Sequence, residues 1–301
     1  MKRFIAYFLA VVGATYALML ANEAVNRQLA FSASNINAYK MHRLIGEQPD
    51  GELPIIGSSR AEAGFAPKEI SENVFNYGLS GSSMRETMFH LKCLLSRKGT
   101  GVILINLDPW GLGNEAFRGD YRYVASSPHV RAEKKIRLSL FDRIPGFRSH
   151  GKFRTNVAEW MNNRLAVTKT MENGAILQRL SRTKAEWEYM ISKSKPQKFQ
   201  YNAETDRMLS ELLAANSAYE IFFVVSPVSP PWWEKFAGKK ELDDLKRRLA
   251  SFPHVHVLDY TGAEYGFDLP KFMDLTHLNE AGARRFSRLL KDRLTPWLSV
   301  R

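Results

Sequence analysis

Short apolar runs alternate with longer amphipathic segments through the part of the chain that follows residue 50. Five runs have the length and composition of buried strands, and they lie at residues 53–57, 74–77, 101–107, 220–225 and 255–258. Apolar residues at helical spacing predict a crossover helix between the second and third runs and further helices at residues 202–215, 234–250 and 279–294. Strands separated by helices predict an α/β fold: a doubly wound parallel sheet in a three-layer α/β/α arrangement.

A long segment interrupts this alternation between the third and fourth predicted strands. Residues 112–200 are far more than a crossover needs, so we predict an insertion with helices of its own. Its first half is strongly basic, with cations at Arg118, Arg122, Arg131, Lys134, Lys135, Arg137, Arg143, Arg148, Lys152 and Arg154. Either these side chains form a solvated helical face, or the insertion is a basic cap over the strand ends that holds an anionic partner or lies on lipid headgroups.

The N-terminal segment has a different pattern, because residues 4–21 contain no charged side chain and follow Lys2 and Arg3. At about 1.5 Å per residue, a helix of this length just crosses a hydrocarbon core of roughly 30 Å. Basic residues before the span and a long chain after it predict a single-pass membrane helix with the remainder exported, to the periplasm or the cell exterior. A cleaved signal peptide and a buried helix of a soluble protein are the alternatives, although no clean A-x-A site follows the run.

These patterns divide the chain into three parts. We expect a membrane anchor at residues 1–24, which binds membrane lipid, and a linker at residues 25–49. The remaining residues, 50–301, are expected to form the α/β domain, interrupted by the basic helical insertion at about 112–200.

The net charge narrows the range of partners. Lys and Arg total 43 against 31 Asp and Glu, a formal charge of +12, which favours an anionic polymer such as an anionic polysaccharide, or an anionic membrane surface. Nucleic acid is also anionic, but the sequence has no zinc-ligand spacing, RNP-like aromatic pattern or helix-turn-helix signature, so we predict no nucleic-acid partner. It has no Walker or Rossmann phosphate loop and no metal-ligand pattern with a third ligand, so we predict no cofactor and no metal.

Candidate chemistry lies at the two ends of the predicted sheet domain. Ser59 directly follows the first predicted strand, at the carboxyl edge where doubly wound sheets bind ligands, and a helix or turn beginning near Ala61 would point backbone N–H groups toward it. Asp274 and His277 are three residues apart, so the carboxylate can orient an imidazole that takes the Ser59 proton. Gly-Ser-Ser is common in turns and a D-x-x-H pair can be a helix cap, but together the two motifs predict a Ser-His-Asp triad.

These residues resemble the SGNH or GDSL-type hydrolase superfamily. Its nucleophile block after the first strand is similar to Gly57-Ser58-Ser59 with the middle acid replaced, and its D-x-x-H block before the last helix is similar to residues 274–277. A second block, N-x-x-x-S-G, is similar to NYGLSG at residues 76–81, and the resemblance implies that Gly81 donates its backbone N–H to an oxyanion. The resemblance covers residues 50–108 and 218–296.

One block departs from the family pattern. The third strand of the family usually ends in Gly-x-Asn-Asp, whose asparagine completes the oxyanion hole, whereas here the equivalent position falls near Asp108 or Pro109. Pro109 has no donor and an ionised Asp108 would repel an oxyanion. The altered blocks and the N-terminal span look most like the membrane-tethered branch that includes the D-alanyl transfer protein DltD and the alginate acetylation proteins AlgJ and AlgX. That branch implies a cell-surface polymer as substrate and a membrane-bound O-acyltransferase as partner.

Two function classes remain open on these residues. One is an exported, membrane-anchored serine esterase or O-acyltransferase that acts on a cell-envelope polysaccharide or related polymer; the other is a non-catalytic SGNH-like protein that binds such a polymer or assembles with a membrane acyltransferase. Arg60, Asp108 and Trp110 are the candidate substrate-binding residues. Arg60 is predicted to bind an anionic substrate or to pair with a surface carboxylate, and Trp110 to wall the site. Trp232 and Trp233 are expected to line a sugar or acyl groove or simply to pack.

Overall fold

The computed structural model of the chain describes residues 1–31, 36–47, 49–97, 101–113, 116–149, 151–165 and 169–298. Two compact units are built from segments that alternate along the sequence. Met1–Glu47 and Gly119–Val167 make up the smaller unit, and Gln48–Arg118 and Thr168–Arg301 make up the larger one. The three-part division of the sequence into anchor, linker and interrupted domain stays a prediction.

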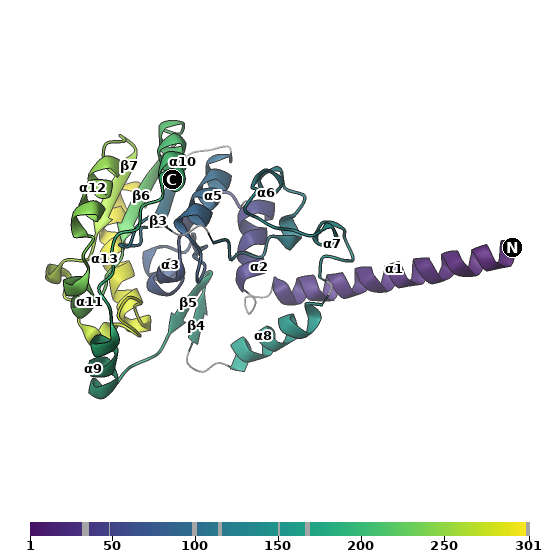
Figure 1. Cartoon of the computed structure of the whole chain (residues 1–301), viewed down its shortest axis with the longest axis horizontal. Helices are drawn as coiled ribbons and strands as arrows, with labels where there is room; N and C mark the ends of the chain where they lie inside the picture. Colours follow the sequence, from purple (N-terminus) through teal and green to yellow (C-terminus); the bar gives the residue numbers. More distant parts are fainter. Residues whose placement is uncertain are drawn as a thin grey trace. The chain divides into compact units, whose positions relative to one another are not determined.

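The larger unit contains the predicted parallel sheet (Figure 1). Its strands lie in the order β2-β1-β3-β6-β7, and all neighbouring pairs are parallel. Their bounds are β1 (Leu53–Ile56), β2 (Val74–Asn76), β3 (Gly101–Asn106), β6 (Tyr219–Val225) and β7 (Val255–Asp259). Every predicted strand is therefore confirmed, with bounds that differ by at most one residue at either end.

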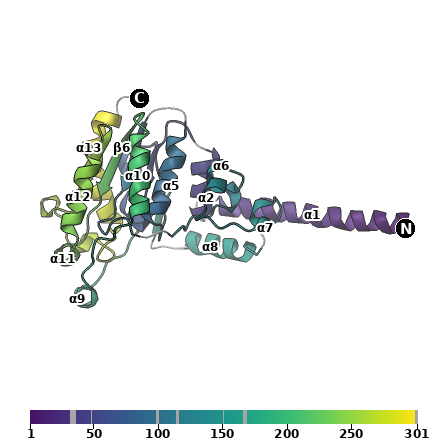
Figure 2. The same cartoon turned by 45° about the horizontal axis from the view of Figure 1, so that its top comes forward.

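Helices cover both faces of this sheet, as the burial of its strands requires. All residues of β1 and β2 are buried, and because successive side chains point to opposite faces, neither face of these strands meets water. α5 (Met84–Leu95) and α10 (Ala203–Ala214) lie side by side, and α13 (Glu280–Leu298) lies against α3 (Ser59–Gly64) and α4 (Pro67–Ile70) (Figure 1 and Figure 2). The doubly wound α/β/α fold class is thus confirmed.

One predicted helix is wrong in its extent. Residues 234–250 were expected to form a single helix, but the structure has α11 (Pro230–Lys235) and α12 (Lys239–Leu249). The chain breaks at Phe236, whose backbone is extended, and the N–H of Ala237 donates to the carbonyl of Gln197, 2.9 Å away, instead of continuing a helix. The smaller 3₁₀ turns η3 (Ala263–Tyr265) and η4 (Leu269–Lys271) lead from β7 toward α13.

The strand order defines where a ligand can bind. β1 lies between β2 and β3, so the connections that leave β1 and β2 proceed in opposite directions across the sheet. In doubly wound sheets such a reversal opens a crevice at the carboxyl ends of the strands. Here the crevice lies after β1 and β3, where Ser59 and Asp108 follow their strands closely.

The last part of the predicted insertion belongs to the larger unit and contains a hairpin that the sequence interpretation missed. β4 (Lys169–Glu172) and β5 (Ala175–Gln178) are antiparallel, and α9 (Lys184–Lys193) follows them. Asn173 and Gly174, with φ of 40° and 83°, form the two-residue turn. Asn-Gly is the preferred pair for such a turn, so the signal was present in the sequence.

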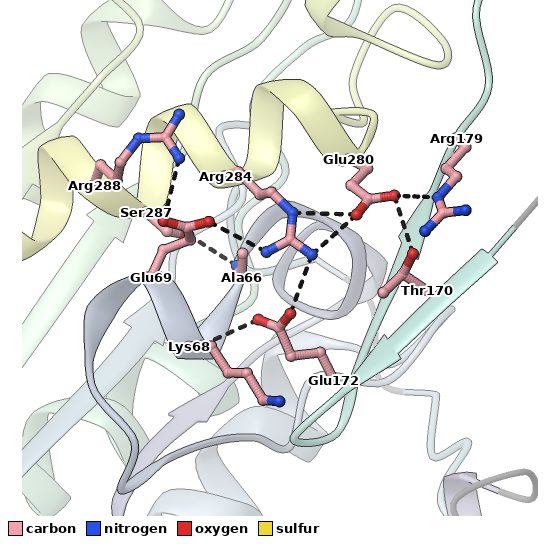
Figure 3. A network of polar contacts seen from close by, with 10 residues as sticks. All are labelled: Ala66, Lys68, Glu69, Thr170, Glu172, Arg179, Glu280, Arg284, Ser287 and Arg288. Carbon is pink, nitrogen blue, oxygen red and sulfur yellow. Dashed lines mark hydrogen bonds and ion pairs between the residues drawn. The ribbon is translucent and has the colours of Figure 1, made fainter.

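A polar network holds this hairpin against α13 and α4 (Figure 3). Arg284 of α13 lies at its centre, 3.2 Å from Glu69, 3.2 Å from Glu172 and 2.9 Å from Glu280. Arg179 and Thr170 bond Glu280, and Arg288 pairs with Glu69. The N–H of Lys68 donates to Glu172, and the N–H of Ala66 donates to the hydroxyl of Ser287. We call these residues the Arg284 network.

The smaller unit is built around the N-terminal helix. α1 (Lys2–Ala30) continues beyond the uncharged segment, and α8 (Phe153–Leu165) packs along its C-terminal part (Figure 1 and Figure 2). The short elements α2 (Ile36–Met41), the π-helix η1 (His42–Glu47), η2 (Arg122–Val124), α6 (Pro128–Ala132) and α7 (Leu140–Arg143) complete it. Among the residues described, α1 is the one helix long and apolar enough to cross a membrane; by length and composition it also fits a signal sequence.

Candidate active site

Ser59 lies where β1 passes into α3. The helix begins at Ser59 itself rather than near Ala61, because the hydroxyl of Ser58 caps it by accepting the N–H of Arg60 at 3.2 Å. Gly57, with φ of 149°, makes the bend, and a Cβ there would lie 2.9 Å from Cβ of Asn106 on the neighbouring strand. The glycine and the two serines therefore allow a tight strand-to-helix turn that leaves the Ser59 side chain at the crevice.

The structure brings Ser59 together with Asp274 and His277. Ser59 Oγ lies 2.8 Å from His277 Nε2, and His277 Nδ1 lies 2.8 Å from Asp274 Oδ2 and 3.0 Å from Oδ1. The serine–imidazole distance falls within the expected hydrogen-bond range of about 2.6–3.2 Å. This chain of contacts has the order hydroxyl, imidazole, carboxylate, as nucleophilic catalysis by serine requires. The catalytic roles of the three residues stay a prediction.

A closed loop between η4 and α13 positions the acid and the base. A single antiparallel bridge joins Phe272 to Leu278 across the loop. Inside it, the backbone N–H groups of Thr276 and His277 both donate to Asp274 Oδ1 at 2.8 Å. The Thr276 hydroxyl bonds the same oxygen at 3.1 Å. The D-x-x-H spacing thus lets one carboxylate hold both the backbone and the ring of the histidine.

The same bonds set the ionisation of Asp274. Burial by itself raises the pKa of this carboxyl, but the hydrogen bond and charge of His277 and the two backbone N–H donors outweigh it and bring the pKa to about 2. Asp274 is therefore ionised at neutral pH. An ionised carboxylate at Nδ1 holds the proton on that nitrogen and leaves Nε2 as the acceptor for the Ser59 hydroxyl.

Two backbone N–H groups bear on an oxyanion: that of Ser59 itself and that of Gly81, on the turn that follows β2. The N–H of Ser59 belongs to the first turn of α3, where no intrahelical acceptor exists. The turn that carries Gly81 is attached to the end of β1, because the N–H of Leu79 and the hydroxyl of Ser82 donate to the Gly57 carbonyl at 3.0 and 3.1 Å. Among the residues that the structure describes, neither Ser59 nor Gly81 has an acceptor for its N–H. The proposed oxyanion role of Gly81 stays a prediction.

Arg60 lies in the interior, which excludes one of the two roles that the sequence suggested; its predicted binding of an anionic substrate stays a prediction. Its side chain is 1% exposed, so it does not pair with a surface carboxylate. Nε donates to the carbonyl of Thr276 at 3.1 Å, and Nη2 donates to the carbonyls of Ser226 and Pro227 at 2.6 and 3.0 Å. Through Thr276, Arg60 connects the segment that carries Ser59 to the loop that carries Asp274 and His277.

Asp108 is the carboxylate that faces this arginine. Its Oδ1 lies 3.6 Å from Arg60 Nη1 and accepts from the side-chain amide of Asn106 at 2.8 Å. Burial raises the pKa of Asp108, although the charge of Arg60 and the hydrogen bond from Ser58 act in the opposite direction. At the position where the family has an asparagine donor, this chain therefore has a buried carboxylate next to an arginine.

A cavity of about 400 Å³ opens beside these residues. It is lined by Ser82, Ser83, Met84, Asp108, Trp110, Gly111, Gly113, Gln197, Gln200, Trp232 and Thr276. Trp110 and Trp232 meet edge to face with ring centroids 5.8 Å apart, and the Arg60 guanidinium lies 5.4 Å from the Trp110 ring centroid. The cavity thus combines two indole rings with side-chain amides and hydroxyls, next to the Thr276 that bonds Asp274.

Several residues of this region were not singled out from the sequence. Asn106 joins Asp108 to Ser226, whose hydroxyl donates to Asn106 Oδ1 at 2.8 Å. Gln197 and Gln200 come from the end of the insertion, and the two-way backbone pairing of Gln200 with Trp110 and Leu112 brings them to the cavity. No local pattern marks these glutamines, because only the tertiary fold places them there. Within the described residues, no group of three His, Cys, Asp or Glu side chains is arranged to hold a metal.

The sequence and the fold were compared with those of known proteins. No protein-family model matches the sequence. No curated protein matches it either. Among solved structures, the fold is similar to that of a protein from Streptococcus pneumonia described as a "putative platelet activating factor", with 14% sequence identity and a TM-score of 0.42. The similarity covers 91% of this chain and 98% of that one.

Proposed function

We propose that this chain is a serine esterase or O-acyltransferase, anchored to a membrane by α1 and exported, that acts on a cell-envelope polysaccharide or a related polymer. The observation that carries the proposal is the continuous hydrogen-bond chain from Ser59 through His277 to Asp274. A serine hydroxyl has no nucleophilic strength of its own at neutral pH and needs an adjacent base. Here the base is in contact with the hydroxyl, and an ionised carboxylate orients the base.

The chemistry follows from these contacts. Ser59 Oγ attacks the carbonyl carbon of an ester while its proton passes to His277 Nε2, and Asp274 stabilises the imidazolium that results. Backbone N–H groups, those of Ser59 and Gly81 in this proposal, receive the oxyanion. The leaving alcohol takes the proton from His277, which leaves an acyl group on Ser59. Water or a sugar hydroxyl then attacks the acyl group and gives its proton to His277, which returns it to Ser59.

The cavity supports an uncharged sugar ring as the group bound beside the triad. Indole rings stack on the apolar faces of sugars, and glutamine amides and serine hydroxyls can bond sugar hydroxyls. Of the described residues that line the cavity, only Asp108 carries a formal charge, and Arg60 lies next to it. An anionic polysaccharide would therefore bind through the basic residues of the chain elsewhere, with a neutral part of the polymer at the cavity.

The membrane part of the proposal rests on α1, which begins after the first residue and contains no charge between residues 4 and 21. We expect a reporter enzyme fused after Arg301 to be active outside the cytoplasm and the full chain to resist extraction from membranes by carbonate. A transferase of this kind needs an acyl donor, and a membrane-bound O-acyltransferase is the partner that we propose. A protein recovered in the soluble cytoplasmic fraction would contradict the anchor and remove the envelope substrate.

Turnover of a chromogenic acetyl ester by the full chain in detergent micelles tests the chemistry. We expect Ser59→Ala to abolish release of the chromophore and Ser58→Ala to reduce it only mildly, since Ser58 caps α3 and does not contact His277. Adding a neutral oligosaccharide and measuring its acetylation by mass spectrometry distinguishes transfer from hydrolysis. Equal turnover by the wild type and Ser59→Ala would contradict the proposal, and wild-type turnover no faster than the reaction without protein would favour a non-catalytic binding protein.

A further inference from the structure

The loop that carries α7 is fixed beside the last turns of the uncharged part of α1. The N–H of Gly146 donates to the carboxylate of Glu23 on α1, and the same carboxylate pairs with Arg148 at 2.9 Å. A Cβ at Gly146 would lie 3.5 Å from Leu20 and 3.7 Å from Tyr16. These contacts all lie within the smaller unit, and they attach residues 139–149, which we call the α7 loop, to a defined level of the helix.

That level can be compared with the position of a membrane. If residues 4–21 span the hydrocarbon core, their C-terminal end marks the boundary between acyl chains and headgroups on the exported side. At a rise of about 1.5 Å per residue, Leu20 lies within about 2 Å of that end along the axis and Tyr16 about 8 Å before it. The α7 loop, which contacts both, would therefore lie in the headgroup layer rather than in free water.

The side chains of the loop suit that layer. Leu140 is 71% exposed, Phe141 52% and Ile144 36%, so three large apolar side chains of one short segment face outward. Exposed apolar side chains that cluster, unlike isolated ones, usually mark an interaction surface. The acid of the loop, Asp142, is engaged in the capping box with Ser139 at the start of α7.

Exposed cations accompany these apolar side chains. Arg143, Lys152 and Arg154 are exposed, and in the part of the chain that the structure describes none of them has a carboxylate within 4 Å. Arg148 is the cation of this segment that is neutralised, by Glu23. Each lysine or arginine near an anionic bilayer surface strengthens binding to it, and apolar side chains inserted at the acyl boundary strengthen it further.

We propose that the α7 loop, with Lys152 and Arg154, is an interfacial collar that inserts Leu140, Phe141 and Ile144 into an anionic phospholipid surface. This inference rests on the membrane anchoring proposed above, and it goes further because it gives the smaller unit a fixed depth and orientation on the bilayer. Continuity with the membrane-spanning helix and the sign of the exposed charge favour lipid over a protein partner. It also gives three cations of the basic first half of the insertion, Arg143, Lys152 and Arg154, a role at headgroups, apart from the cavity.

The test measures contact between the loop and lipid in the full chain, reconstituted in nanodiscs. A fluorophore is attached to Phe141→Cys or to the control Met161→Cys, and quenching by phospholipids with a nitroxide near the headgroup is recorded. Met161 is similarly exposed, at 49%. It lies on α8 after Asn156, whose side chain bonds Asn26 of α1, beyond the uncharged segment of that helix. Residue 161 is therefore expected to lie outside the lipid and serves as the control. Burial raises the pKa of the native Cys93 thiol to about 12, so it does not compete for the label.

We expect several-fold stronger quenching at residue 141 than at residue 161, and stronger quenching in phosphatidylglycerol than in phosphatidylcholine. The double variant Arg143→Glu/Lys152→Glu should remove the difference between the two lipids while Phe141→Cys remains quenched in both. Equal quenching at 141 and 161 in a chain that resists carbonate extraction would overturn the collar and leave the anchor intact. Quenching at 141 that is seen in nanodiscs but is absent in native membranes loaded with the same nitroxide phospholipids would assign the loop to a protein partner and overturn the lipid inference. Extraction by carbonate would overturn the anchor itself.

Discussion

Two polar networks join the segment after β1 to the C-terminal part of the chain, and they differ in how they do so. The first, at the carboxyl edge of the sheet, contains Ser59, Arg60, Asp274 and His277, and its arginine is 1% exposed and bonds three backbone carbonyls. The second is the Arg284 network (Figure 3), whose central arginine has a side chain 27% exposed and pairs with three carboxylates.

The two networks differ in whether a polar group that loses its arginine still has another hydrogen-bond partner or water. A group at the edge of the Arg284 network can return to water, and each carboxylate that loses Arg284 keeps another partner or solvent. A buried carbonyl that loses Arg60 has neither, and the buried Asp108 would lose its nearest cation. Substitutions in the first network should therefore be severe and specific, whereas those in the second should be mild and graded.

The largest expected effect belongs to His277. His277→Ala removes the base that contacts Ser59. We therefore expect kcat for ester hydrolysis to fall on the order of 10⁴- to 10⁶-fold, close to the loss in Ser59→Ala, because triad members act as a unit. Steady-state kinetics of both variants and of the double variant measure this. Losses that multiply in the double variant would show that the two residues act independently and would contradict the account.

Asp274→Asn should be the next most severe. The amide keeps the size of the side chain but presents no charge to His277, so the ring loses its preferred tautomer and orientation. We expect kcat to fall on the order of 10⁴-fold with the fold retained. Asp268→Asn, a change of the same kind at an exposed position just before η4, should leave kcat unchanged. A loss of less than about tenfold in Asp274→Asn would remove the carboxylate from the mechanism.

Arg60→Met should cost the most stability. It leaves the carbonyls of Thr276, Ser226 and Pro227 without their donor, and we expect the free energy of unfolding to fall by about 3–5 kcal/mol in denaturant titrations. Adding Asp108→Leu should restore part of the loss, since that change removes the uncompensated carboxylate. If the two single losses simply add, Arg60 and Asp108 are not coupled.

The pH dependence of stability gives a further comparison. The pKa of Asp274, about 2 in the folded chain, lies below its ordinary value of 3.8, so its contribution to stability is present above about pH 4 and is lost as pH falls toward 2. We expect the stability difference between the wild type and Asp274→Asn to be constant from pH 7 to about 5 and to shrink below about 4. A difference that grows as pH falls would have the wrong sign and would contradict the assignment.

Arg284→Met should have the smallest effect of the five predictions in this comparison. Its ion pairs to the half-buried Glu69 and Glu280 and to the buried Glu172, which keeps the N–H of Lys68, contribute about 1–2 kcal/mol together. They should weaken in salt. Arg288→Met, which removes one exposed pair with Glu69, should cost less than about 0.5 kcal/mol. A loss from Arg284→Met as large as that from Arg60→Met would remove the distinction between the two networks.

The sequence predicted the sheet well because parallel strands buried on both faces appear as continuous apolar runs, such as GVILI before Asn106. It failed where local pattern and tertiary structure compete. The single helix expected at residues 234–250 is broken because Ala237 pairs with Gln197 from another segment. The hairpin at Asn173-Gly174 was missed because its strands are short and partly polar, so the turn signal stood without an apolar alternation beside it.

In the candidate site, too, some residues could be predicted from local sequence pattern and others are placed only by the tertiary fold. Ser59, Asp274 and His277 could be paired from the sequence because the carboxyl edge of a doubly wound sheet collects residues that follow different strands. The surroundings of Arg60 could not be predicted, since its acceptors are backbone carbonyls, which carry no residue signature. Gln197 and Gln200 reach the cavity only through the path of the insertion.

Labelling with a serine-directed fluorophosphonate probe tests the central claim most directly, because the probe reacts only with a serine activated by a base. We expect the wild-type full chain to be labelled, with the adduct located by peptide mass spectrometry on the segment that contains Ser59. Ser58→Ala should be labelled as well, whereas Ser59→Ala and His277→Ala should not. Labelling of Ser59→Ala at the level of the wild type, or no labelling of the wild type with the fold intact, would contradict the claim that Ser59, His277 and Asp274 form a catalytic triad.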